Sequence, residues 1–391
     1  MQELHRMIGR GVVEIISESG LRERLKNGKK LRIKLGVDPS RPDIHLGHAV
    51  ALWQLKKFQD AGHKVIFLIG DYTSLIGDPS GKNKTRPVLT PEEVKANAKT
   101  YLDQVGLILD IDKIEVRHNS EWFSKMNFAD LIALGSKFSV ANIIERDDFS
   151  KRLSSGSEIA MHELFYPMMQ AYDSVMLEAD IEVGGTDQKF NLLAGRELQR
   201  KMHQVPQELI MTELLVGTDG KEKMSKSLGN YVGIAEPSRE QYGKIMSIPD
   251  QAIISYFKLC TEVSDQTISD YQSAMESDVN PRDIKARLAF EIVKIYHGEE
   301  EAKKAEEAFD AQFRDNKIPE DIDEVELTGN FDPALLIINL GGASSNSEAR
   351  RLVEQGALRI DGARIEDLKA PISIASGMVI QLGKRRWWRI K

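Results

Sequence analysis

Short apolar segments alternate with amphipathic helical patterns through the first half of the chain. The alternation predicts strands over residues 31–37, 64–70, 114–117 and 181–183, and helices over residues 45–61, 91–105, 162–179 and 188–202. Thr90 stands where an N-cap of the second helix is expected. Strands that alternate with helices are typical of a parallel sheet covered on both faces. The pattern therefore predicts an α/β, Rossmann-like domain, whose ligands bind beyond the carboxyl ends of the strands.

The pattern changes in the second half. Residues 217–233 are rich in Gly and Lys without a clear period, which predicts a long mobile loop, and residues 238–313 show a helical pattern. An acidic segment over residues 318–330 contains Pro319 and reads as a linker. We therefore predict a Rossmann-like catalytic domain over residues 1–232, an all-helical domain with the linker over residues 233–328, and a small α+β domain over residues 329–391.

Composition agrees with a soluble globular protein, with 41% hydrophobic and 29% charged residues among 391. The chain has one cysteine, Cys260, in an apolar run, which predicts a buried structural thiol. A single cysteine permits no disulfide within the chain and fits a reducing cytoplasm. No window reaches the roughly 20 apolar residues that span a bilayer, so we expect no membrane partner.

Charge is unevenly distributed along the acidic chain, whose net charge is −7. Residues 299–327 carry 12 acidic and 4 basic side chains, whereas residues 331–391 carry 10 basic and 6 acidic ones. A basic terminal unit on an acidic protein indicates a local contact with RNA or phosphate. A solvated surface would account for the composition equally well.

A first motif follows the strand predicted at 31–37. Residues 38–48 read Asp-Pro-Ser-Arg-Pro-Asp-Ile-His-Leu-Gly-His and open a helix. The imidazoles of His45 and His48, with the free backbone N–H groups of a helix N-terminus, can bind phosphate, and Gly47 lets a nucleotide approach the backbone. Zinc is disfavoured, because the pair lacks nearby Cys or Glu ligands. Two surface histidines without a function are the plain alternative.

A second motif lies inside the Gly- and Lys-rich segment. Lys223, Met224, Ser225, Lys226 and Ser227 place two cations and two hydroxyls on the predicted loop. This arrangement suits a polyphosphate that a moving loop covers. A solvated basic turn is the alternative for this motif alone. The two motifs in this order, on either side of an α/β unit, are far more specific than either one.

Together the motifs resemble the signatures of the class I aminoacyl-tRNA synthetases. Residues 77–82 (GDPSGK), 166–173 (YPMMQAYD) and 184–188 (GGTDQ) are similar to the bacterial-type tyrosyl enzymes, and residues 347–357 resemble the RNA-binding domain named after ribosomal small-subunit protein four. The resemblance covers almost the whole chain. It implies a homodimeric, cytoplasmic ligase that activates L-tyrosine with ATP and transfers it to tRNA(Tyr). It also implies Mg2+ arriving with ATP, no permanent cofactor and no protein metal site.

The resemblance also implies roles for individual residues. The phosphates of ATP would be met by Ser40, His45, Lys82, Arg86, Lys223 and Lys226, and the rest of the nucleotide by Asp38, Gly47, His48, Gly185 and Asp187. Tyrosine would be bound through Asp78, Tyr166 and Gln170 at its amino group, through Gln188 at its carboxylate, and through Asp173 at its hydroxyl. The attacking carboxylate is already ionised, so positioning and charge stabilisation suffice and no general base is needed.

Helical spacing supports the tyrosine site. Tyr166, Gln170 and Asp173 lie at i, i+4 and i+7, so one helix face presents all three, although a partly buried polar face would have the same spacing. One departure concerns Lys34, which stands where many tyrosyl enzymes have a tyrosine. Its ammonium would bracket the substrate hydroxyl together with Asp173, or would pair with Asp173 alone.

Three rival functions are weaker. A tryptophanyl-tRNA synthetase is disfavoured by Asp173 and by the C-terminal unit, and a small adenylyl or cytidylyl transferase by the helical domain. An RNA-binding protein with an inactive fold is disfavoured by the intact His45/His48 and Lys223/Lys226 sets. The apolar segment 127–144 reads as a dimer interface, and a core helix would explain it equally well.

Overall fold

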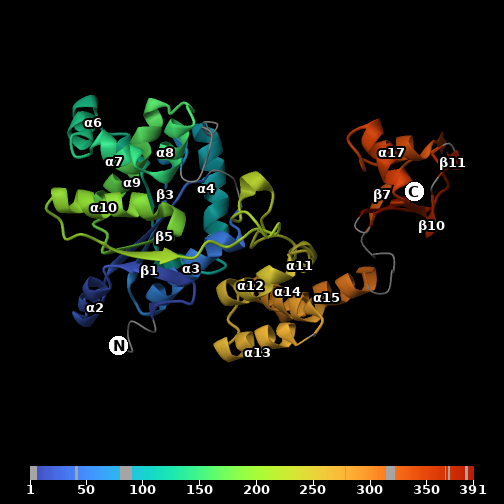
Figure 1. Cartoon of the computed structure of the whole chain (residues 1–391), viewed down its shortest axis with the longest axis horizontal. Helices are drawn as coiled ribbons and strands as arrows, with labels where there is room; N and C mark the ends of the chain where they lie inside the picture. Colours follow the sequence, from blue (N-terminus) through green and yellow to red (C-terminus); the bar gives the residue numbers. More distant parts are fainter. Residues whose placement is uncertain are drawn as a thin grey trace. The chain divides into compact units, whose positions relative to one another are not determined.

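The computed structural model describes residues 7–39, 43–79, 90–277, 279–313, 322–365, 367–368, 370–383 and 386–391. Two compact units make up the chain, residues 1–302 and residues 303–391, and each is described by itself. Figure 1 shows the α/β part and a helical part in the first unit, and a small α+β fold in the second.

A six-stranded sheet forms the centre of the first unit. Its strands follow the order β1-β6-β5-β2-β3-β4. Their bounds are Val12–Ile16 for β1, Arg32–Val37 for β2, Lys64–Ile69 for β3, Glu115–His118 for β4, Ile181–Gly185 for β5 and Glu208–Thr212 for β6. All neighbours from β6 to β4 pair in parallel, and β1 pairs antiparallel with β6. The predicted parallel α/β sheet is confirmed.

Helices lie on both faces of this sheet in Figure 1. The helices of this part of the first unit are α2 (Glu18–Lys26), α3 (Leu46–Asp60), α4 (Pro91–Val105), α5 (Ser120–Phe123), α6 (Phe128–Gly135), α7 (Val140–Ile144), α8 (Asp147–Ser154), α9 (Phe165–Met176) and α10 (Lys189–Lys201). Thr90 is the N-cap of α4, as predicted: its hydroxyl accepts from Glu93 N, and Glu93 Oε2 accepts from Thr90 N at 2.8 Å. Reciprocal bonds of this kind fix where a helix begins.

Two strands were not predicted from the sequence. β1 and β6 contact each other at the edge of the sheet, and every residue of β6 is buried. Strands as short as these carry little periodicity of their own, and β1 pairs with a strand almost two hundred residues away along the chain. Long-range pairing therefore decided their structure.

The predicted helical region is confirmed in the second half of the first unit. Its helices are α11 (Ser238–Met246), α12 (Ile253–Cys260), α13 (Asp265–Glu276), α14 (Pro281–His297) and α15 (Glu299–Phe313), of which the last runs into the second unit. Cys260 ends α12 and is 2% exposed, which confirms the buried thiol. Burial raises the pKa of this thiol, so it stays protonated and unreactive.

After the end of α15, the described part of the second unit holds short strands around the helices α16 and α17. A five-stranded sheet has the order β10-β9-β12-β13-β7, and β8 pairs with β11. The bounds are Asp323–Val325 (β7), Asn330–Phe331 (β8), Pro333–Asn339 (α16), Asn346–Glu354 (α17), Leu358–Ile360 (β9), Ala363–Arg364 (β10), Ile372–Ser373 (β11), Val379–Leu382 (β12) and Arg386–Ile390 (β13). Leu336, Ile380 and Trp388 are among its buried core residues.

The position of β7 bears on the linker predicted over residues 318–330. β7 pairs in parallel with β13, so Asp323–Val325 contribute to the sheet of the second unit. Residues 314–321, with Pro319, lie outside the described residues. A strand that begins at residue 323 makes the separating segment shorter than the sequence suggested.

Candidate active site

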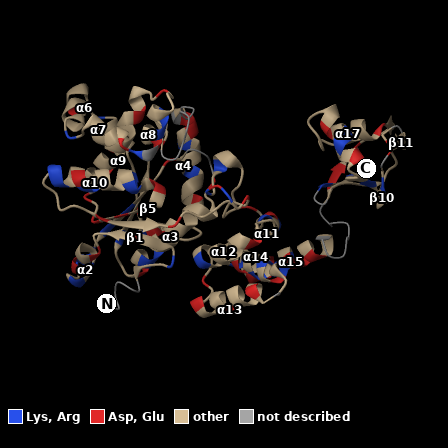
Figure 2. Cartoon of the chain, in the orientation of Figure 1, with Lys and Arg blue, Asp and Glu red and all other residues tan. Residues whose placement is uncertain are grey.

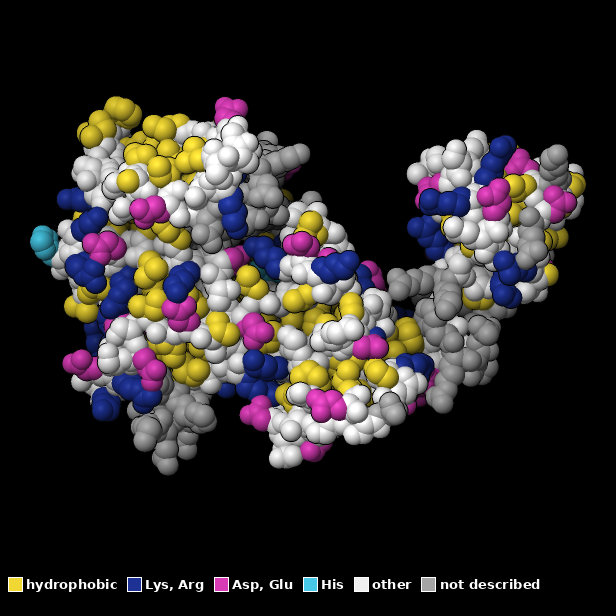
Figure 3. All heavy atoms as spheres, viewed as in Figure 1, with side chains coloured by type: hydrophobic (Ala, Val, Ile, Leu, Met, Phe, Trp, Pro, Cys, Tyr) yellow, Lys and Arg dark blue, Asp and Glu magenta, His cyan; other side chains and the backbone are white. Residues whose placement is uncertain are grey.

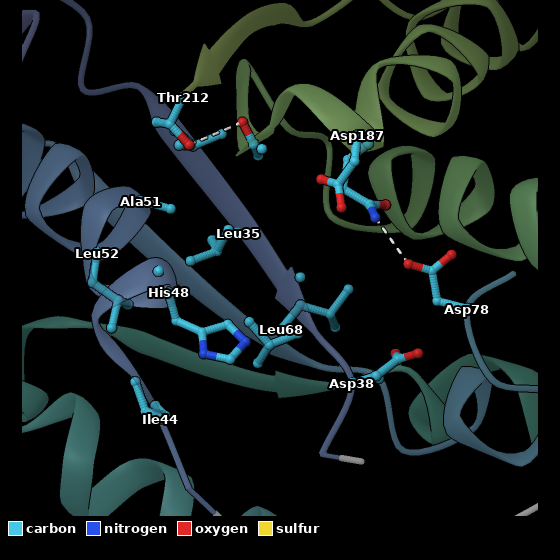
Figure 4. Close-up of a pocket in the computed structure, with 18 of the residues that line it drawn as sticks. Leu35, Asp38, Ile44, His48, Ala51, Leu52, Leu68, Asp78, Asp187 and Thr212 are labelled. Carbon is cyan, nitrogen blue, oxygen red and sulfur yellow. Dashed lines mark hydrogen bonds between the residues drawn. The ribbon is translucent and has the colours of Figure 1, made fainter. Parts of the chain in front are cut away.

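A cavity of about 610 Å³ opens at the carboxyl ends of β2, β3 and β5, where ligands of parallel sheets bind. Both sequence motifs and the polar face of α9 contribute to its wall. Its lining includes Lys34, Asp38, His45, Gly47, His48, Asp78, Tyr166, Gln170, Asp173, Gly185, Asp187, Gln188, Lys223 and Lys226. Figure 4 shows Asp38, His48, Asp78 and Asp187 around this pocket, carried by different segments. Ser40, Lys82 and Arg86 lie outside the described residues.

The first motif forms the N-terminus of α3. His45 is its N-cap, and its backbone N–H donates to His48 Nδ1 over 3.3 Å, with ring centroids 3.8 Å apart. Burial, and the nearby Lys226 ammonium, lower the pKa of His48 to about 3, and burial likewise lowers the pKa of His45. Both imidazoles are therefore neutral at pH 7 and can act as hydrogen-bond donors rather than cations.

Gly47 packs closely against the ring of His45 inside this motif. A Cβ on Gly47 would lie 3.1 Å from the ring of His45 and 3.6 Å from Met224 Cβ. The tight contact is therefore with the ring of His45, whereas the distance to Met224 is an ordinary van der Waals contact. Gly185 has a similar constraint, because a Cβ there would lie 2.8 Å from Asp187 Oδ1.

Backbone contacts join the segment 217–233 to the first motif. Leu46 N donates to Val232 O at 3.0 Å, Ile234 N donates to Ile44 O at 3.0 Å, and His45 forms a bridge with Gly233. The end of this segment is therefore fixed beside α3. Its lysines reach into the cavity wall from this anchor.

The two lysines of the second motif have different partners. Lys223 forms an ion pair with Asp187, at the end of β5. Lys226 is 7% exposed, and its ammonium donates to the Tyr101 hydroxyl at 2.8 Å while lying 4.8 Å from the centre of the Tyr101 ring. Tyr101 belongs to α4 and was not predicted as a site residue.

The face of α9 lies across the cavity from these lysines, and Asp38 connects the two sides. The Tyr166 hydroxyl donates to Asp38 Oδ2 at 2.9 Å, and Thr73 Oγ1 donates to Asp38 Oδ1 at 2.8 Å. Gln188 Nε2 donates to Asp78 Oδ2 at 2.8 Å, as the dashed line in Figure 4 shows. The structure thus brings Asp38, Asp78 and Tyr166 to one cavity.

Asp173 lies at the buried end of the same helix face. Its carboxylate accepts from Trp122 Nε1 at 3.0 Å and from Asn119 Nδ2 at 3.4 Å. Burial raises the pKa of Asp173 to about 7, against the opposing effect of the Lys34 charge and the two hydrogen bonds. The carboxyl is therefore poised between its protonated and ionised forms near neutral pH.

Lys34 forms its ion pair with Glu182 and not with Asp173, which was the pairing considered from the sequence. The ammonium lies 3.0 Å from Glu182 Oε1 and donates to Ser174 Oγ at 2.9 Å and, more weakly, to Gln170 O at 3.4 Å. The reason is register, because Lys34 on β2 stands opposite Glu182 on β5. A glutamate inside an otherwise apolar strand is the sequence signal that could have pointed to this pair, which was not predicted from the sequence.

Two buried acceptor or donor atoms in the cavity wall have no hydrogen-bond partner within the described part of the chain. They are Gln170 Oε1 and His45 Nδ1. Leaving such atoms unpaired costs free energy, so each is a candidate contact for a bound substrate. Both were predicted to be substrate contacts.

Among the described residues, no three His, Cys, Asp or Glu side chains converge as metal ligands would. Likewise, none of the helices that the structure describes combines the length and apolarity needed to cross a membrane.

Comparison with known proteins gives a family for each part of the chain. Residues 26–314 match the tRNA synthetases class I (W and Y), and residues 336–380 match the S4 domain. The tyrosine–tRNA ligase of Thermotoga maritima is 51% identical over 390 residues, covering 100% of this chain and 97% of that protein. The same enzyme from Dehalococcoides mccartyi is 50% identical over 388 residues, covering 98% of both chains.

Solved structures agree on the fold. A C-terminally truncated mitochondrial tyrosyl-tRNA synthetase of Aspergillus nidulans superposes with a TM-score of 0.64 at 24% identity, covering 80% of this chain and 93% of that one. The tyrosyl-tRNA synthetase of Archaeoglobus fulgidus complexed with L-tyrosine superposes with a TM-score of 0.62 at 23% identity, covering 78% of this chain and 99% of that one. Because its relatives match along the whole chain and both of its matched domains agree, this chain belongs to the bacterial tyrosyl-tRNA synthetases of the class I family.

Proposed function

We propose that the cavity at the ends of β2, β3 and β5 is where this tyrosine–tRNA ligase forms tyrosyl-adenylate and then transfers tyrosine to tRNA(Tyr). One observation carries the assignment: His45, His48 and Lys226 line one side of a single cavity, and the polar face of α9 lines another. A phosphate-binding side and an amino-acid-binding side within one cavity suit a reaction that joins ATP to tyrosine.

The nucleotide side acts through hydrogen bonds and cations. ATP would contact Asp38, His45, Gly47, His48, Gly185, Asp187, Lys223 and Lys226. Neutral His45 and His48 donate N–H groups to the phosphates without adding charge to the free enzyme, and Lys226 supplies the positive charge that the pentacovalent transition state and leaving pyrophosphate need. Ser40, Lys82 and Arg86 are proposed to join them on the ground of the motif resemblance alone.

The amino-acid side would hold tyrosine between two polar ends. Gln170 Oε1, Asp78 and Tyr166 offer acceptors for the ammonium group, and Gln188 Nε2 offers a donor for the carboxylate. Asp173 would accept the hydrogen bond of the phenol. Lys34 is proposed to support this contact by fixing α9 through Ser174 and Gln170, because its ammonium already has partners.

Magnesium is proposed to enter as the complex with ATP. Mg2+ prefers oxygen ligands, keeps several waters and binds substrate phosphates together with one or two carboxylates. Asp187, the carboxylate assigned above to the nucleotide, fits that chemistry. When bound, the ion neutralises charge on the phosphates; the positioning of the reactants is left to the side chains described above.

The second unit is proposed to bind tRNA. It contains the S4 match, and the exposed side chains of Arg350 and Arg359 offer cations for phosphates. Trp388 is 7% exposed and belongs to the core, whereas Trp387 is only partly buried. Trp387 is therefore the tryptophan available to stack on a base.

The protein is further proposed to be a cytoplasmic homodimer through α6 and α7. Phe128, Ile132 and Val140 are 76%, 59% and 64% exposed. The ribbon of α6 is mostly uncharged in Figure 2, and Figure 3 shows hydrophobic spheres gathered over the same end of the unit. Apolar surface of this kind on a soluble protein marks an interface.

The activity is tested by ATP–pyrophosphate exchange with each proteinogenic amino acid in turn. Tyrosine is expected to support exchange far better than any other, because the carboxyl of Asp173 would lose its partner with an amino acid that lacks the hydroxyl. Faster exchange with tryptophan would overturn the assignment of the pocket. Exchange without any charging of tRNA(Tyr) would overturn the proposed second step.

A further inference from the structure

One face of α4 contacts both motifs of the active site. Asn97, Tyr101 and Gln104 lie at i, i+4 and i+7 of this helix, so they share a face. Asn97 Nδ2 donates to Pro39 O at 2.9 Å, and Gln104 Oε1 accepts from Ile44 N at 2.6 Å. The helix therefore holds the backbone at two points within the first motif.

Tyr101 extends this contact to the second motif. Its hydroxyl accepts the hydrogen of Lys226 Nζ at 2.8 Å and donates to Asp38 O at 3.4 Å, and its ring lies under the same ammonium. Tyr101 is 2% exposed, so the contact is shielded from water. A buried hydrogen bond from a charged donor is stronger than one between neutral groups.

We propose that Tyr101 is a positioning residue for the activation step, which fixes the ammonium of Lys226 beside the ATP-binding face of α3. The proposal rests on the function proposed above for Lys226. A lysine side chain has several rotatable bonds, and its ammonium stabilises the transition state only when it is held at the phosphates. The Tyr101 hydroxyl and ring supply that constraint from α4, outside both motifs.

Asp38 makes the contact chain continuous with the tyrosine side. The carbonyl of Asp38 accepts from Tyr101, and its carboxylate accepts from Tyr166. If Tyr101 served only to hold Asp38, its loss would weaken tyrosine binding through Tyr166. If Tyr101 holds Lys226, its loss lowers the rate of adenylate formation instead. Measuring both quantities therefore distinguishes the two roles.

The test uses Tyr101→Phe in the full chain, which removes the hydroxyl and keeps the ring. We expect a roughly tenfold lower single-turnover rate of tyrosyl-adenylate formation, with an unchanged dissociation constant for tyrosine. Tyr242→Phe is the matched control: Tyr242 is equally buried, its hydroxyl donates to Ala286 O at 3.4 Å, and it belongs to α11. Equal melting temperatures for both variants and the wild type would establish that they fold.

The decisive measurement repeats Tyr101→Phe in a Lys226→Ala background. If Tyr101 acts through Lys226, Tyr101→Phe causes no further loss in the rate of adenylate formation once Lys226 is alanine. The same tenfold loss in both backgrounds, a loss confined to tyrosine binding, or a faster rate in the single variant would overturn the proposal. A wild-type enzyme without tyrosine-dependent exchange would instead refute the function of the pocket, so the two failures are distinguishable.

Discussion

The ammonium of Lys34 lies 3.0 Å from the Oε1 of Glu182, on adjacent parallel strands, and both side chains are almost completely buried. Gln207 Nε2 and Ser174 Oγ also donate to the Glu182 carboxylate. Taking one charge from a buried pair leaves the other without compensation, which costs more than the pair contributes. The floor of the tyrosine site therefore depends on both residues together.

Lys34→Met is expected to lower the free energy of unfolding by about 3–5 kcal/mol and to weaken tyrosine binding, because Glu182 is left charged and α9 loses its contact. Urea unfolding and equilibrium binding of tyrosine measure the two effects. The double variant Lys34→Met/Glu182→Gln should recover most of the stability and the preference for tyrosine over phenylalanine. A stable double variant that accepts phenylalanine equally well would show instead that Lys34 reads the hydroxyl directly.

Asp173 gives a pH dependence of defined sign. Its pKa rises from 3.8 to about 7 on folding, so between these values the folded protein holds a proton that the unfolded chain has lost. The contribution of Asp173 to the free energy of unfolding therefore falls as pH rises, by about 1.4 kcal/mol per pH unit at most. Asp173→Asn has no such proton, so the unfolding free energy of the wild type minus that of the variant should fall from pH 4 to pH 7.

His48 acts in the opposite direction, because its pKa falls from 6.5 to about 3 and its contribution to stability rises with pH over that interval. The comparison of wild type with Asp173→Asn removes this term, since both proteins contain His48. A difference in unfolding free energy that stays constant with pH would contradict a raised pKa of Asp173.

Sequence patterns predicted those parts of the site that lie within one local segment. The helix spacing of Tyr166 and Asp173 and the order of the two motifs each depend on neighbours along the chain. The Lys34–Glu182 pair depends on the register of β2 against β5, and the Tyr101–Lys226 contact joins residues 125 positions apart. Contacts of this second kind follow from tertiary packing, and short-range periodicity does not contain them.

Lys226→Ala is expected to lower the rate of adenylate formation by roughly a hundredfold or more, with little change in tyrosine affinity. The lysine lies on the phosphate side of the cavity, and it contributes mainly when charge moves onto the pyrophosphate. Rapid-quench measurement of adenylate and equilibrium binding of tyrosine separate the two quantities. His45→Ala should also slow activation, and a wild-type rate in that variant would exclude His45 from the site.

Ile132→Asp is expected to shift the protein from dimer to monomer, because a charge at the centre of an apolar interface loses its hydration on association. Analytical ultracentrifugation over a range of concentrations measures the change. Val205→Asp is the control, since Val205 is 73% exposed and lies in the connection between α10 and β6. An unchanged dimer in Ile132→Asp, or equal dissociation in both variants, would exclude α6 as the interface.

Removal of residues 314–391, the part of the second unit after α15 and here called the tail, should separate the two steps of the reaction. All the described residues proposed to bind ATP or tyrosine precede residue 227, so their cavity does not require the tail. The tail has its own hydrophobic core and two small sheets, which is what an independently folding unit needs. Because β7 belongs to one of these sheets, a cut after residue 328 would leave a strand behind, and a cut after Phe313 would not.

Truncation after Phe313 is therefore expected to leave tyrosine-dependent pyrophosphate exchange nearly unchanged and to impair charging of tRNA(Tyr) strongly. Charging of tRNA(Tyr) by the full-length enzyme should weaken steeply as the salt concentration rises. Cations such as Arg350 and Arg359 bind phosphates by displacing counterions, and added salt opposes this displacement. Pyrophosphate exchange and charging of tRNA(Tyr), each measured for both enzymes at low and at moderate salt, test this prediction. Charging that survives the truncation would exclude the tail as the RNA-binding unit, and exchange that collapses with it would place the tail within the catalytic unit.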